Sequence, residues 1–243
     1  MKKILILEGS PRLNGNSCLL SDEFARGAEE AGCSVEKIAV ARKRVAGCLG
    51  CNACYRNDGV CVQKDDMVEI REKMLGADVI VLASPIYFYS MTAQLKAVID
   101  RSYAFFSQLA GKTFYFIISC AAPDEALTET MQAALRGFTC CVPDSVEGGV
   151  ILGTGANDAG DIRHSPAMEQ AYQMGRSFAA QEEQHGCRIS SMRAASASFT
   201  ARSSCPGSRR RSRSWASGCW SSPRGVFSLG SRPCYAVSDL HKG

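Results

Sequence analysis

Five short apolar runs alternate with five segments of helical periodicity over residues 1–182, and this alternation constrains the fold more than any other feature. The runs predict buried strands at residues 2–7, 35–40, 78–83, 112–119 and 149–152. Strands that alternate with helices form right-handed crossovers in a parallel sheet, and strands that are apolar along their whole length are covered on both faces. The sequence therefore predicts an α/β fold, a doubly wound three-layer α/β/α sandwich around a five-stranded parallel sheet.

Local signals predict where several of these elements begin and end. Helical spacing predicts helices within residues 17–31, 67–74, 95–99 and 127–138, and from Ser165 onward. Gly32 is expected to end the first helix. Asp65 and Asp66 are expected to cap the second, with Glu69 completing a capping box. Pro85 is expected to end the third strand, and the fifth strand is expected to be short.

The composition changes abruptly near residue 183. Residues 1–182 carry a net charge of −4, whereas residues 183–243 carry +8 and include only 7 Ile, Leu, Val or Phe residues among 61. A segment with so few large apolar residues buries too little surface to fold alone. We therefore predict a folded domain at residues 1–182 and a disordered Ser/Arg-rich tail at residues 183–243. The tail is either a natural appendage or the product of a frame error in the gene.

Charge and hydropathy exclude several classes of partner. The basic charge is confined to the tail, so it predicts no specific nucleic-acid binding. The chain has no run of about 18 apolar residues, and the N-terminal apolar run is too short for a signal peptide. We expect a cytoplasmic protein with no membrane partner.

The first candidate binding segment is the loop of residues 9–17, where the first strand leads into the first helix. Ligands of open α/β sheets bind at the carboxyl ends of the strands. Ser10, Asn16 and Ser17 supply hydroxyl and amide groups, Arg12 supplies a positive charge, and the helix start supplies free N–H groups. The glycine spacing matches neither a dinucleotide fingerprint nor a Walker loop. The pattern favours a monophosphate site, although a simple helix cap uses the same residue types.

The second candidate segment follows the third strand and contains three consecutive aromatic residues, Tyr87, Phe88 and Tyr89. Aromatic residues in a loop favour a planar ligand or a partner surface. At least one of the three is expected to cover the core instead. A phosphate-type loop beside an aromatic loop is the pattern of a site for a mononucleotide with a flat ring.

A third segment holds four closely spaced cysteines, Cys48, Cys51, Cys54 and Cys61. Close cysteine spacing followed by one later cysteine is typical of iron–sulfur ligation. A tetrahedral zinc site and unligated thiols are the alternatives, and the spacing leaves all three open. The remaining cysteines of residues 1–182 are expected to be small buried apolar residues; they are Cys18, Cys33, Cys120, Cys140 and Cys141.

No Ser/His/Asp or Cys/His arrangement for nucleophilic catalysis is evident in the sequence. Asp100 and Arg101, adjacent near the end of the third helix, are interpreted as a structural ion pair rather than as a cofactor contact.

Together these motifs resemble those of the flavodoxin-like NAD(P)H-dependent FMN reductases, and within them the branch that includes the iron–sulfur flavoproteins. The resemblance covers roughly residues 1–180, in order. It is carried by the loop of residues 9–17, the cysteine loop with Val62, Asp65, Asp66 and Met67, and the segments 84–88, 93–96, 100–101, 153–156, 160–162 and 165–168. It implies a flavodoxin-like sheet, tightly bound FMN, and a homodimer or higher homo-oligomer with the flavin near the interface.

The resemblance also implies a role for each loop. It assigns the FMN phosphate to Ser10, Arg12, Asn16 and Ser17, the flavin ring to Pro85, Ile86, Tyr87 and Phe88, and the flavin edge to Ser119, Cys120 and Ala121. It allows a four-iron four-sulfur cluster on Cys48, Cys51, Cys54 and Cys61, although relatives without a cluster carry a similar loop.

The activity implied is that of an FMN-dependent oxidoreductase. Such a protein takes hydride from NAD(P)H and passes electrons to a second acceptor: a quinone, a nitroaromatic, a metal ion or a protein. The cofactor supplies the chemistry, so no side-chain acid or base is expected. Two alternatives are an electron carrier that combines FMN with a cluster, and a thiol or metal sensor on the same fold.

Overall fold

The computed structural model of the chain describes residues 1–179. The boundary predicted at residue 182 and the tail predicted at residues 183–243 lie outside the described residues.

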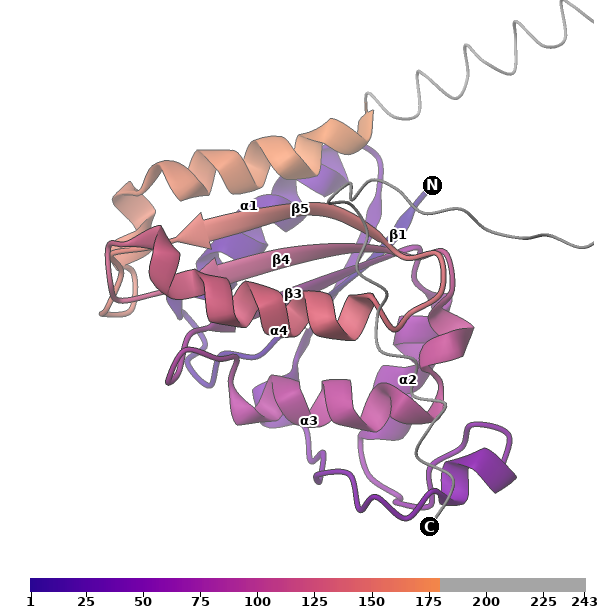
Figure 1. Cartoon of the computed structure of the whole chain (residues 1–243). Coiled ribbons are helices and arrows are strands. Elements are labelled where there is room, and N and C mark those ends of the chain that lie inside the picture. Colours follow the sequence, from indigo (N-terminus) through magenta and orange to yellow (C-terminus); the bar gives the residue numbers. More distant parts are fainter. Residues whose placement is uncertain (180–243) are drawn as a thin grey trace, which may run out of the picture. The chain divides into compact units, whose positions relative to one another are not determined.

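A five-stranded parallel sheet forms the middle layer, as the sequence predicted (Figure 1). Its strands are β1 (Lys3–Glu8), β2 (Ser34–Ala39), β3 (Val79–Pro85), β4 (Thr113–Ser119) and β5 (Val146–Gly153). Their order is β2-β1-β3-β4-β5. The chain therefore moves outward from β1 in one direction, to β2, and then in the other, to β3. In doubly wound folds such a reversal marks the point at which ligands bind, here between the loops that follow β1 and β3.

Helices cover both faces of the sheet. The labelled helices are α1 (Asn16–Glu30), α2 (Met67–Gly76), α3 (Ala93–Arg101) and α4 (Glu129–Thr139), and a fifth helix occupies residues 166–179. Figure 1 shows α1 and the helix of residues 166–179 on one face, and α3 and α4 on the other. The predicted three-layer sandwich is thus confirmed.

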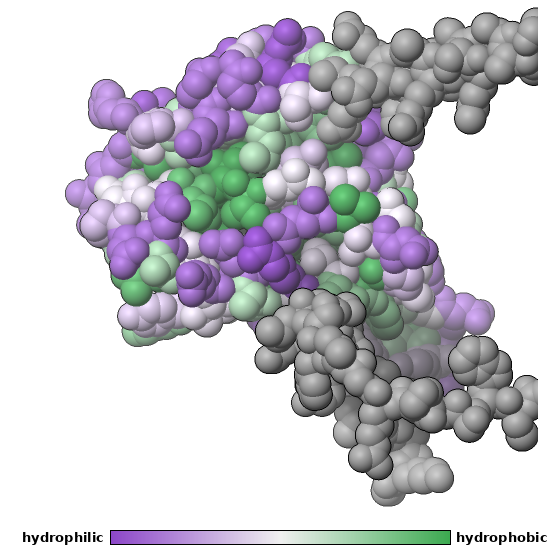
Figure 2. Space-filling model, turned by 45° about the horizontal axis from the view of Figure 1, so that its top comes forward, coloured by the Kyte–Doolittle hydropathy of each residue, from purple (hydrophilic) through white to green (hydrophobic). Residues whose placement is uncertain are grey.

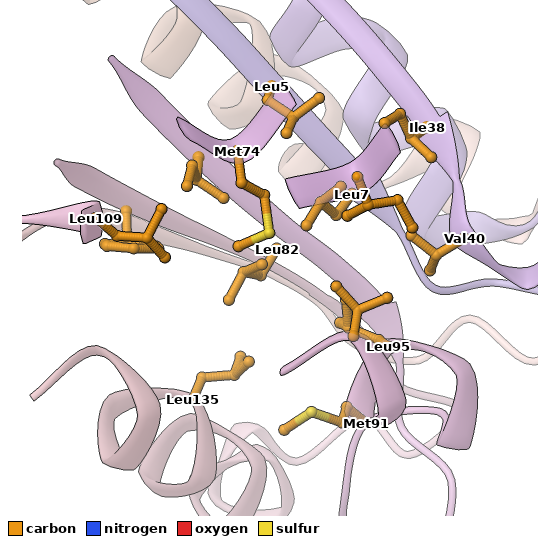
Figure 3. Close-up of a cluster of buried hydrophobic side chains, with 14 of the residues drawn as sticks. Leu5, Leu7, Ile38, Val40, Met74, Leu82, Met91, Leu95, Leu109 and Leu135 are labelled. Carbon is orange, nitrogen blue, oxygen red and sulfur yellow. The ribbon is translucent and has the colours of Figure 1, made fainter. Parts of the chain in front are cut away.

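The core consists of two apolar clusters, one on each face. Because successive residues of a strand point to opposite faces, Leu5 and Leu7 of β1 enter one cluster, whereas Ile4 and Ile6 enter the other. The cluster drawn in Figure 3 joins the strands to α2, α3 and α4, for example through Met74, Leu95 and Leu135. The other cluster joins them to α1 and the helix of residues 166–179.

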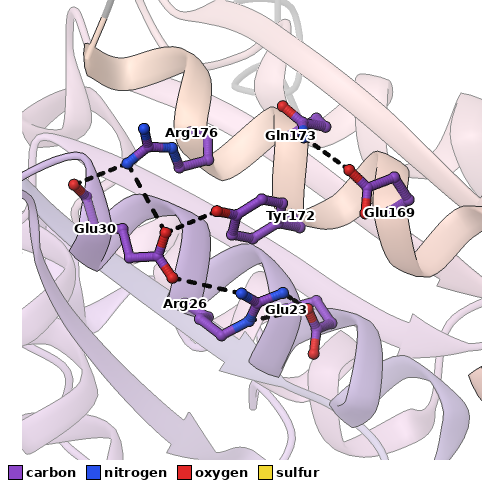
Figure 4. Close-up of polar contacts among 7 residues, drawn as sticks. All are labelled: Glu23, Arg26, Glu30, Glu169, Tyr172, Gln173 and Arg176. Atoms are coloured by element: carbon purple, nitrogen blue, oxygen red, sulfur yellow. Dashed lines mark hydrogen bonds and ion pairs between the residues drawn. The ribbon is translucent and has the colours of Figure 1, made fainter.

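The helix of residues 166–179 crosses α1 at very close range. A Cβ on Gly27 would lie 2.2 Å from the carbonyl oxygen of Tyr172, and a Cβ on Gly175 would lie 2.2 Å from that of Phe24. Around this crossing, Glu30 accepts hydrogen bonds from Tyr172 and Arg26, and Arg176 donates to its carbonyl (Figure 4). Gly27 and Gly175 therefore permit the contact, and exposed polar pairs surround it.

Two strands differ from their predicted form. β3 runs through Ser84 to Pro85 instead of ending before them, because Pro85 lies at the last position of the strand, where it pairs with Ser119. β5 has 8 residues and is not short. The prediction began at Gly149 and missed Val146, Glu147 and Gly148, because Gly148 looks like a loop residue. A Cβ on Gly148 would lie 2.3 Å from the Tyr115 ring, so a glycine is required there.

Helix ends also show differences. Gly32, with a φ of 85°, follows α1 as predicted. The capping box predicted for α2 is absent from the described structure: Asp66 accepts a hydrogen bond from Arg44 N, and Asp65 accepts one from Met67 N. Ser165 accepts a hydrogen bond from Ala167 N at the start of the last helix, as expected.

Within residues 1–179, no helix is both long enough and apolar enough to cross a membrane. On the face shown in Figure 2, hydrophobic residues gather in the middle and hydrophilic residues surround them.

Candidate functional site

The loops that follow β1, β3 and β4 meet at the carboxyl edge of the sheet. Gly9 N donates to Ala83 O over 2.8 Å, and Ile86 N donates to Ser119 O over 2.8 Å. Thr92 Oγ1 donates to Gly9 O, also over 2.8 Å. The first two candidate segments therefore lie side by side, together with the loop at Ser119 that the family resemblance assigned to the flavin edge. We call this region the switch-point edge.

The first loop is folded tightly onto itself. Ser10 Oγ donates to Arg12 O over 3.1 Å and accepts from Arg12 N over 3.2 Å. A Cβ on Gly15 would lie 2.5 Å from Ser10 Oγ, so only glycine fits at this position. Gly15 is also the N-cap of α1, and within the described residues no side chain caps this helix. Its first N–H groups are therefore available to an anion, which fits the predicted phosphate.

Two of the predicted phosphate ligands also bind a neighbouring loop. The Asn16 amide donates to Ala156 O and Asp158 O over 3.1 and 2.9 Å, and its oxygen accepts from Gly160 N over 3.0 Å. Arg12 Nη1 donates to Asn157 O over 3.2 Å. The Asn16 side chain thus holds the loop of residues 156–160 against the start of α1, and we expect its contribution to an anion to come from its backbone N–H.

The aromatic loop projects from the molecule. Tyr87, Phe88 and Tyr89 are 44, 100 and 57% exposed, so the expectation that one of them covers the core is wrong. Phe88 and Tyr89 have φ values of 48° and 63°, which bulky side chains rarely adopt. A bridge between Tyr87 and Ser90 holds this turn. An exposed, constrained aromatic turn beside a helix N-terminus without a side-chain cap is the arrangement expected for a flat ring that carries a phosphate.

The third loop completes this edge. Ser119 and Cys120 are buried, whereas Ala121 is exposed. Cys120 N donates to Gly153 O over 2.8 Å, and Cys120 O accepts from Ala156 N over 3.0 Å. Ala121 therefore lies at the surface, beside the loop that Asn16 holds.

Two buried ionisable groups lie beneath the first loop, and one of them, Glu8, was missed at the sequence level. Glu8 ends β1, and within the described residues its Oε1 has no hydrogen-bond partner. Burial raises the pKa of Glu8, and Lys37 partly opposes this effect. Cys18 is buried, as predicted, and its burial, together with Glu8, raises the pKa of its thiol to about 11. An acidic residue at the end of a buried strand was the available signal.

The four clustered cysteines line one cavity with the end of α3. Cys48, Cys51, Cys54 and Cys61 share this cavity with Arg101 and other residues. Cys48 and Cys51 are exposed, and Cys54 and Cys61 are half-buried. The predicted ligands are thus brought together. We call the segment of residues 46–65 the cysteine loop.

Nothing in residues 1–179 forms a group of three or more His, Cys, Asp or Glu side chains arranged around a single metal ion. The four thiols of a four-iron cluster bind four different iron atoms, so they are spaced more widely than the ligands of one ion. The donor set lining the cavity fits such a cluster, and the metal assignment stays a prediction.

Two cysteines were expected in the core and are not there. Cys33 and Cys120 are buried as predicted, but Cys140 and Cys141 are exposed. They follow the last turn of α4 and lie outside its apolar stripe.

The cysteine loop is attached to α3 by a buried ion pair. Arg101 binds Asp65 through both of its terminal nitrogens, over 2.7 and 3.0 Å. The predicted pairing of Asp100 with Arg101 is wrong: Asp100 pairs with Lys96 one turn away, because adjacent residues of a helix do not face each other. The signal was the position of Arg101, three residues after Val98 on the apolar stripe of α3.

Tyr55 and Tyr103 form a second attachment. Their hydroxyl groups are 2.7 Å apart and their rings meet edge to face. This hydrogen bond, with burial, raises the pKa of Tyr103 to about 12.

The switch-point edge and the cysteine cavity lie at opposite ends of α3. Thr92 caps the first turn of α3 and contacts Gly9, whereas Arg101, its last residue, lines the cysteine cavity. A helix of 9 residues rises about 13 Å along its axis. Thr92 was not singled out from the sequence, although a threonine directly before a helix is a cap signal.

Comparison with known proteins identifies the family. Residues 2–147 match the family model described as NADPH-dependent FMN reductase. An iron–sulfur flavoprotein of Archaeoglobus fulgidus is 42% identical over 101 residues, which are 42% of this chain and 45% of the relative. An FMN-dependent NADH:quinone oxidoreductase of Pseudomonas aeruginosa is 37% identical over 97 residues, 39% of this chain and 40% of the relative.

The matched region spans about half of the length of the curated relatives. Among solved structures, an NAD(P)H:quinone oxidoreductase from Methanothermobacter marburgensis superimposes with a TM-score of 0.59 at 18% identity. The superposition covers 73% of this chain and 96% of that chain, and it shows a common fold. Because the family model covers more than half of the sequence, including the switch-point edge and the cysteine loop, the chain belongs to the NADPH-dependent FMN reductase family.

Proposed function

We propose that the protein is an FMN-dependent oxidoreductase that takes hydride from NAD(P)H and passes the electrons to a second acceptor. The observation that carries this proposal is the switch-point edge, where an uncapped helix N-terminus lies beside an exposed aromatic turn. Family membership supports the same cofactor.

The phosphate end of FMN is assigned to the first loop. Ser10, Arg12 and Ser17 would contribute side chains, and the first turn of α1 would contribute N–H groups. Hydrogen bonds and positive charge around a phosphate give affinity and fix its position. Gly15 permits the tight fold of this loop, because a Cβ there would collide with Ser10 Oγ.

The ring end is assigned to Pro85–Phe88 and to Ser119, Cys120 and Ala121. Thr92 connects the loop that follows β1 with the loop that follows β3. Its hydroxyl donates to Gly9 O, and its backbone N–H donates to Ser84 Oγ over 3.1 Å. FMN, when bound, supplies hydride acceptance and electron donation. The surrounding residues bind and orient, and no side-chain acid or base is assigned.

The electron acceptor is proposed by class. One curated relative is named as a quinone oxidoreductase, and we propose a quinone as the first acceptor to test. The exposed aromatic turn offers a flat surface to such a ring. We also propose a homodimer, which would cover exposed apolar surface of the kind that Figure 2 shows.

A second candidate function is that of an electron carrier with FMN and a four-iron four-sulfur cluster. The specific observation in its favour is that all four clustered cysteines line one cavity. The names of several curated relatives, among them an iron–sulfur flavoprotein of Methanosarcina thermophila, support a cluster.

One experiment separates these functions. An absorbance spectrum of anaerobically purified protein should show flavin bands, and addition of NADPH or NADH should bleach them within the time of mixing. Loss of the flavin absorbance on addition of NADPH or NADH, followed by its return when a quinone is added, supports the oxidoreductase. Flavin that is reduced only by dithionite supports the carrier, and a colourless protein contradicts both.

A further inference from the structure

Arg101 is a buried charge at the end of α3, and within residues 1–179 its hydrogen-bond partners all belong to the cysteine loop. Its side chain is only 1% exposed. Besides the two bonds to Asp65, Nη1 donates to Ala46 O over 2.9 Å. An arginine side chain stays protonated in proteins even when it is buried. The guanidinium is therefore a fixed positive charge.

These contacts close the cysteine loop at its base. Ala46 and Asp65 are its first and last residues, and Arg101 binds both of them. Asp65 Oδ2 also accepts from Ala46 N over 3.1 Å. Next to this point, Asp66 accepts from Arg44 N over 2.7 Å and its own N–H donates to Arg44 O. All four clustered cysteines lie between the two ends that Arg101 joins.

One donor of Arg101 is unused. Within residues 1–179, the buried Nε has no hydrogen-bond partner. A buried N–H group without an acceptor is unfavourable and rare in folded proteins. Arg101 lines the cavity of the four cysteines and lies beside Cys61. This is a location at which an additional anionic acceptor would satisfy the group.

We propose that Arg101 is the positioning residue of the cysteine loop: it joins the two ends of the loop to α3 and presents a buried cation to whatever anionic group the cysteines hold. The part of this inference that concerns an iron–sulfur cluster rests on the second candidate function proposed above. The part that concerns the arrangement of the loop rests only on the contacts of Arg101. Residues that orient metal ligands typically change metal retention when they are replaced.

The test compares Arg101→Lys with wild type in the full chain. Lysine keeps the charge but cannot bind both carboxylate oxygens and Ala46 O in the same fork geometry. Arg136→Lys is the matched control, because Arg136 binds Glu147 through two nitrogens, both over 2.8 Å, on an exposed surface of β5 and α4. FMN content of each protein is measured first, as a check of folding.

Two readouts follow. The first is the rate at which a chelator removes iron from anaerobically purified protein; we expect a loss about tenfold faster in Arg101→Lys and an unchanged rate in Arg136→Lys. The second is the rate of alkylation of Cys61, measured by mass spectrometry on metal-free protein relative to Cys140. We expect Cys61 to react faster in Arg101→Lys only.

The possible results distinguish the assignment of a cluster from the positioning role of Arg101. Wild-type protein without iron or acid-labile sulfide contradicts the proposed cluster, and the alkylation rates then decide the role of Arg101. If iron is present and Arg101→Lys matches wild type in both readouts, Arg101 does not position the loop, although the cluster assignment survives. If Arg101→Lys does not fold, Asp65→Asn, which keeps the size of the carboxylate and removes its charge, is measured in the same way with the same expected changes.

Discussion

The two ends of α3 differ in how the loops beside them are held in place. At the switch-point edge, short loops are tied to one another by backbone hydrogen bonds. Within residues 1–179, this edge nevertheless has a helix without a side-chain cap, an aromatic turn with positive φ and a buried Glu8 Oε1 without a hydrogen bond. At the other end, a long loop with exposed cysteines is held at its base by one buried ion pair. Strain and unsatisfied groups of the first kind are typical of a ligand site on a rigid scaffold. A long loop that is fixed mainly at its base, as the cysteine loop is, suits a ligand that is held between the side chains of the loop itself.

The largest expected effect concerns the cysteine loop. Replacement of Cys51 and Cys54 by serine should abolish iron binding, because a cluster loses two thiolate ligands at once. FMN content should remain, since the two ends of α3 are about 13 Å apart. Iron and sulfide per FMN measure the result. Cys140→Ser with Cys141→Ser is the control, since these exposed cysteines lie elsewhere. Iron that is unchanged in the double variant would refute the ligand assignment.

The next effect concerns the scaffold of the switch-point edge. In Gly9→Ala the new Cβ would lie 2.8 Å from Thr92 Oγ1 and 2.9 Å from Leu95 Cβ, which forces β1 and α3 apart. We expect the free energy of unfolding to fall by about 1–3 kcal/mol, with weaker FMN binding. Urea unfolding measures it. Gly137→Ala, in α4 with open space around it, should not destabilise the protein. Equal stability of the two variants would show that the close packing at Gly9 does not constrain the edge.

A third prediction tests the phosphate assignment. Arg12→Ala with Ser17→Ala removes one charge and one hydroxyl from the first loop. Hydrogen bonds to charged groups contribute about 1.5–3 kcal/mol each, so FMN affinity should fall at least about tenfold. Titration of flavin fluorescence measures this affinity. Arg26→Ala, on an exposed turn of α1 beyond the loop, is the control. An unchanged affinity in the double variant places the phosphate elsewhere.

The smallest measurable effect concerns the buried charge beneath the first loop. Because the pKa of Glu8 is raised, its carboxyl is most favourable when protonated, and stability is lost as pH rises through the raised pKa. Glu8→Gln should therefore stabilise the protein at pH 7, by about 1 kcal/mol, and by less below pH 4.5. Unfolding curves across pH measure the difference. The exposed Glu72→Gln should show no such trend. A stability difference that does not depend on pH would mean that Glu8 is not a buried charge.

The sequence predicted the switch-point edge better than the cysteine loop, for a physical reason. Apolar runs and helical spacing are local signals, and parallel strands bring their carboxyl ends to one edge, so the loops of residues 9–17 and 84–92 had to become neighbours. The pairing of Asp65 with Arg101 joins residues 36 positions apart and leaves no local pattern except an arginine on an apolar stripe. β5 was shortened in the prediction because Gly148, which its packing against Tyr115 requires, looks like a loop residue in sequence. Tertiary packing decided each of these cases.

Removal of residues 182–243 is expected to have no effect on the activity if the two ends of α3 account for it. A chain that ends at Gln181 keeps both regions and the whole helix of residues 166–179. The sequence after residue 182 is poor in large apolar residues and carries +8, so its removal should cost little buried surface. FMN content, solubility and NAD(P)H oxidation should equal those of the full chain. The shortened chain should lose only a weak binding of polyanions, which in the full chain should decrease with rising salt concentration. Release of FMN or precipitation on truncation would show that residues 183–243 contribute to the fold.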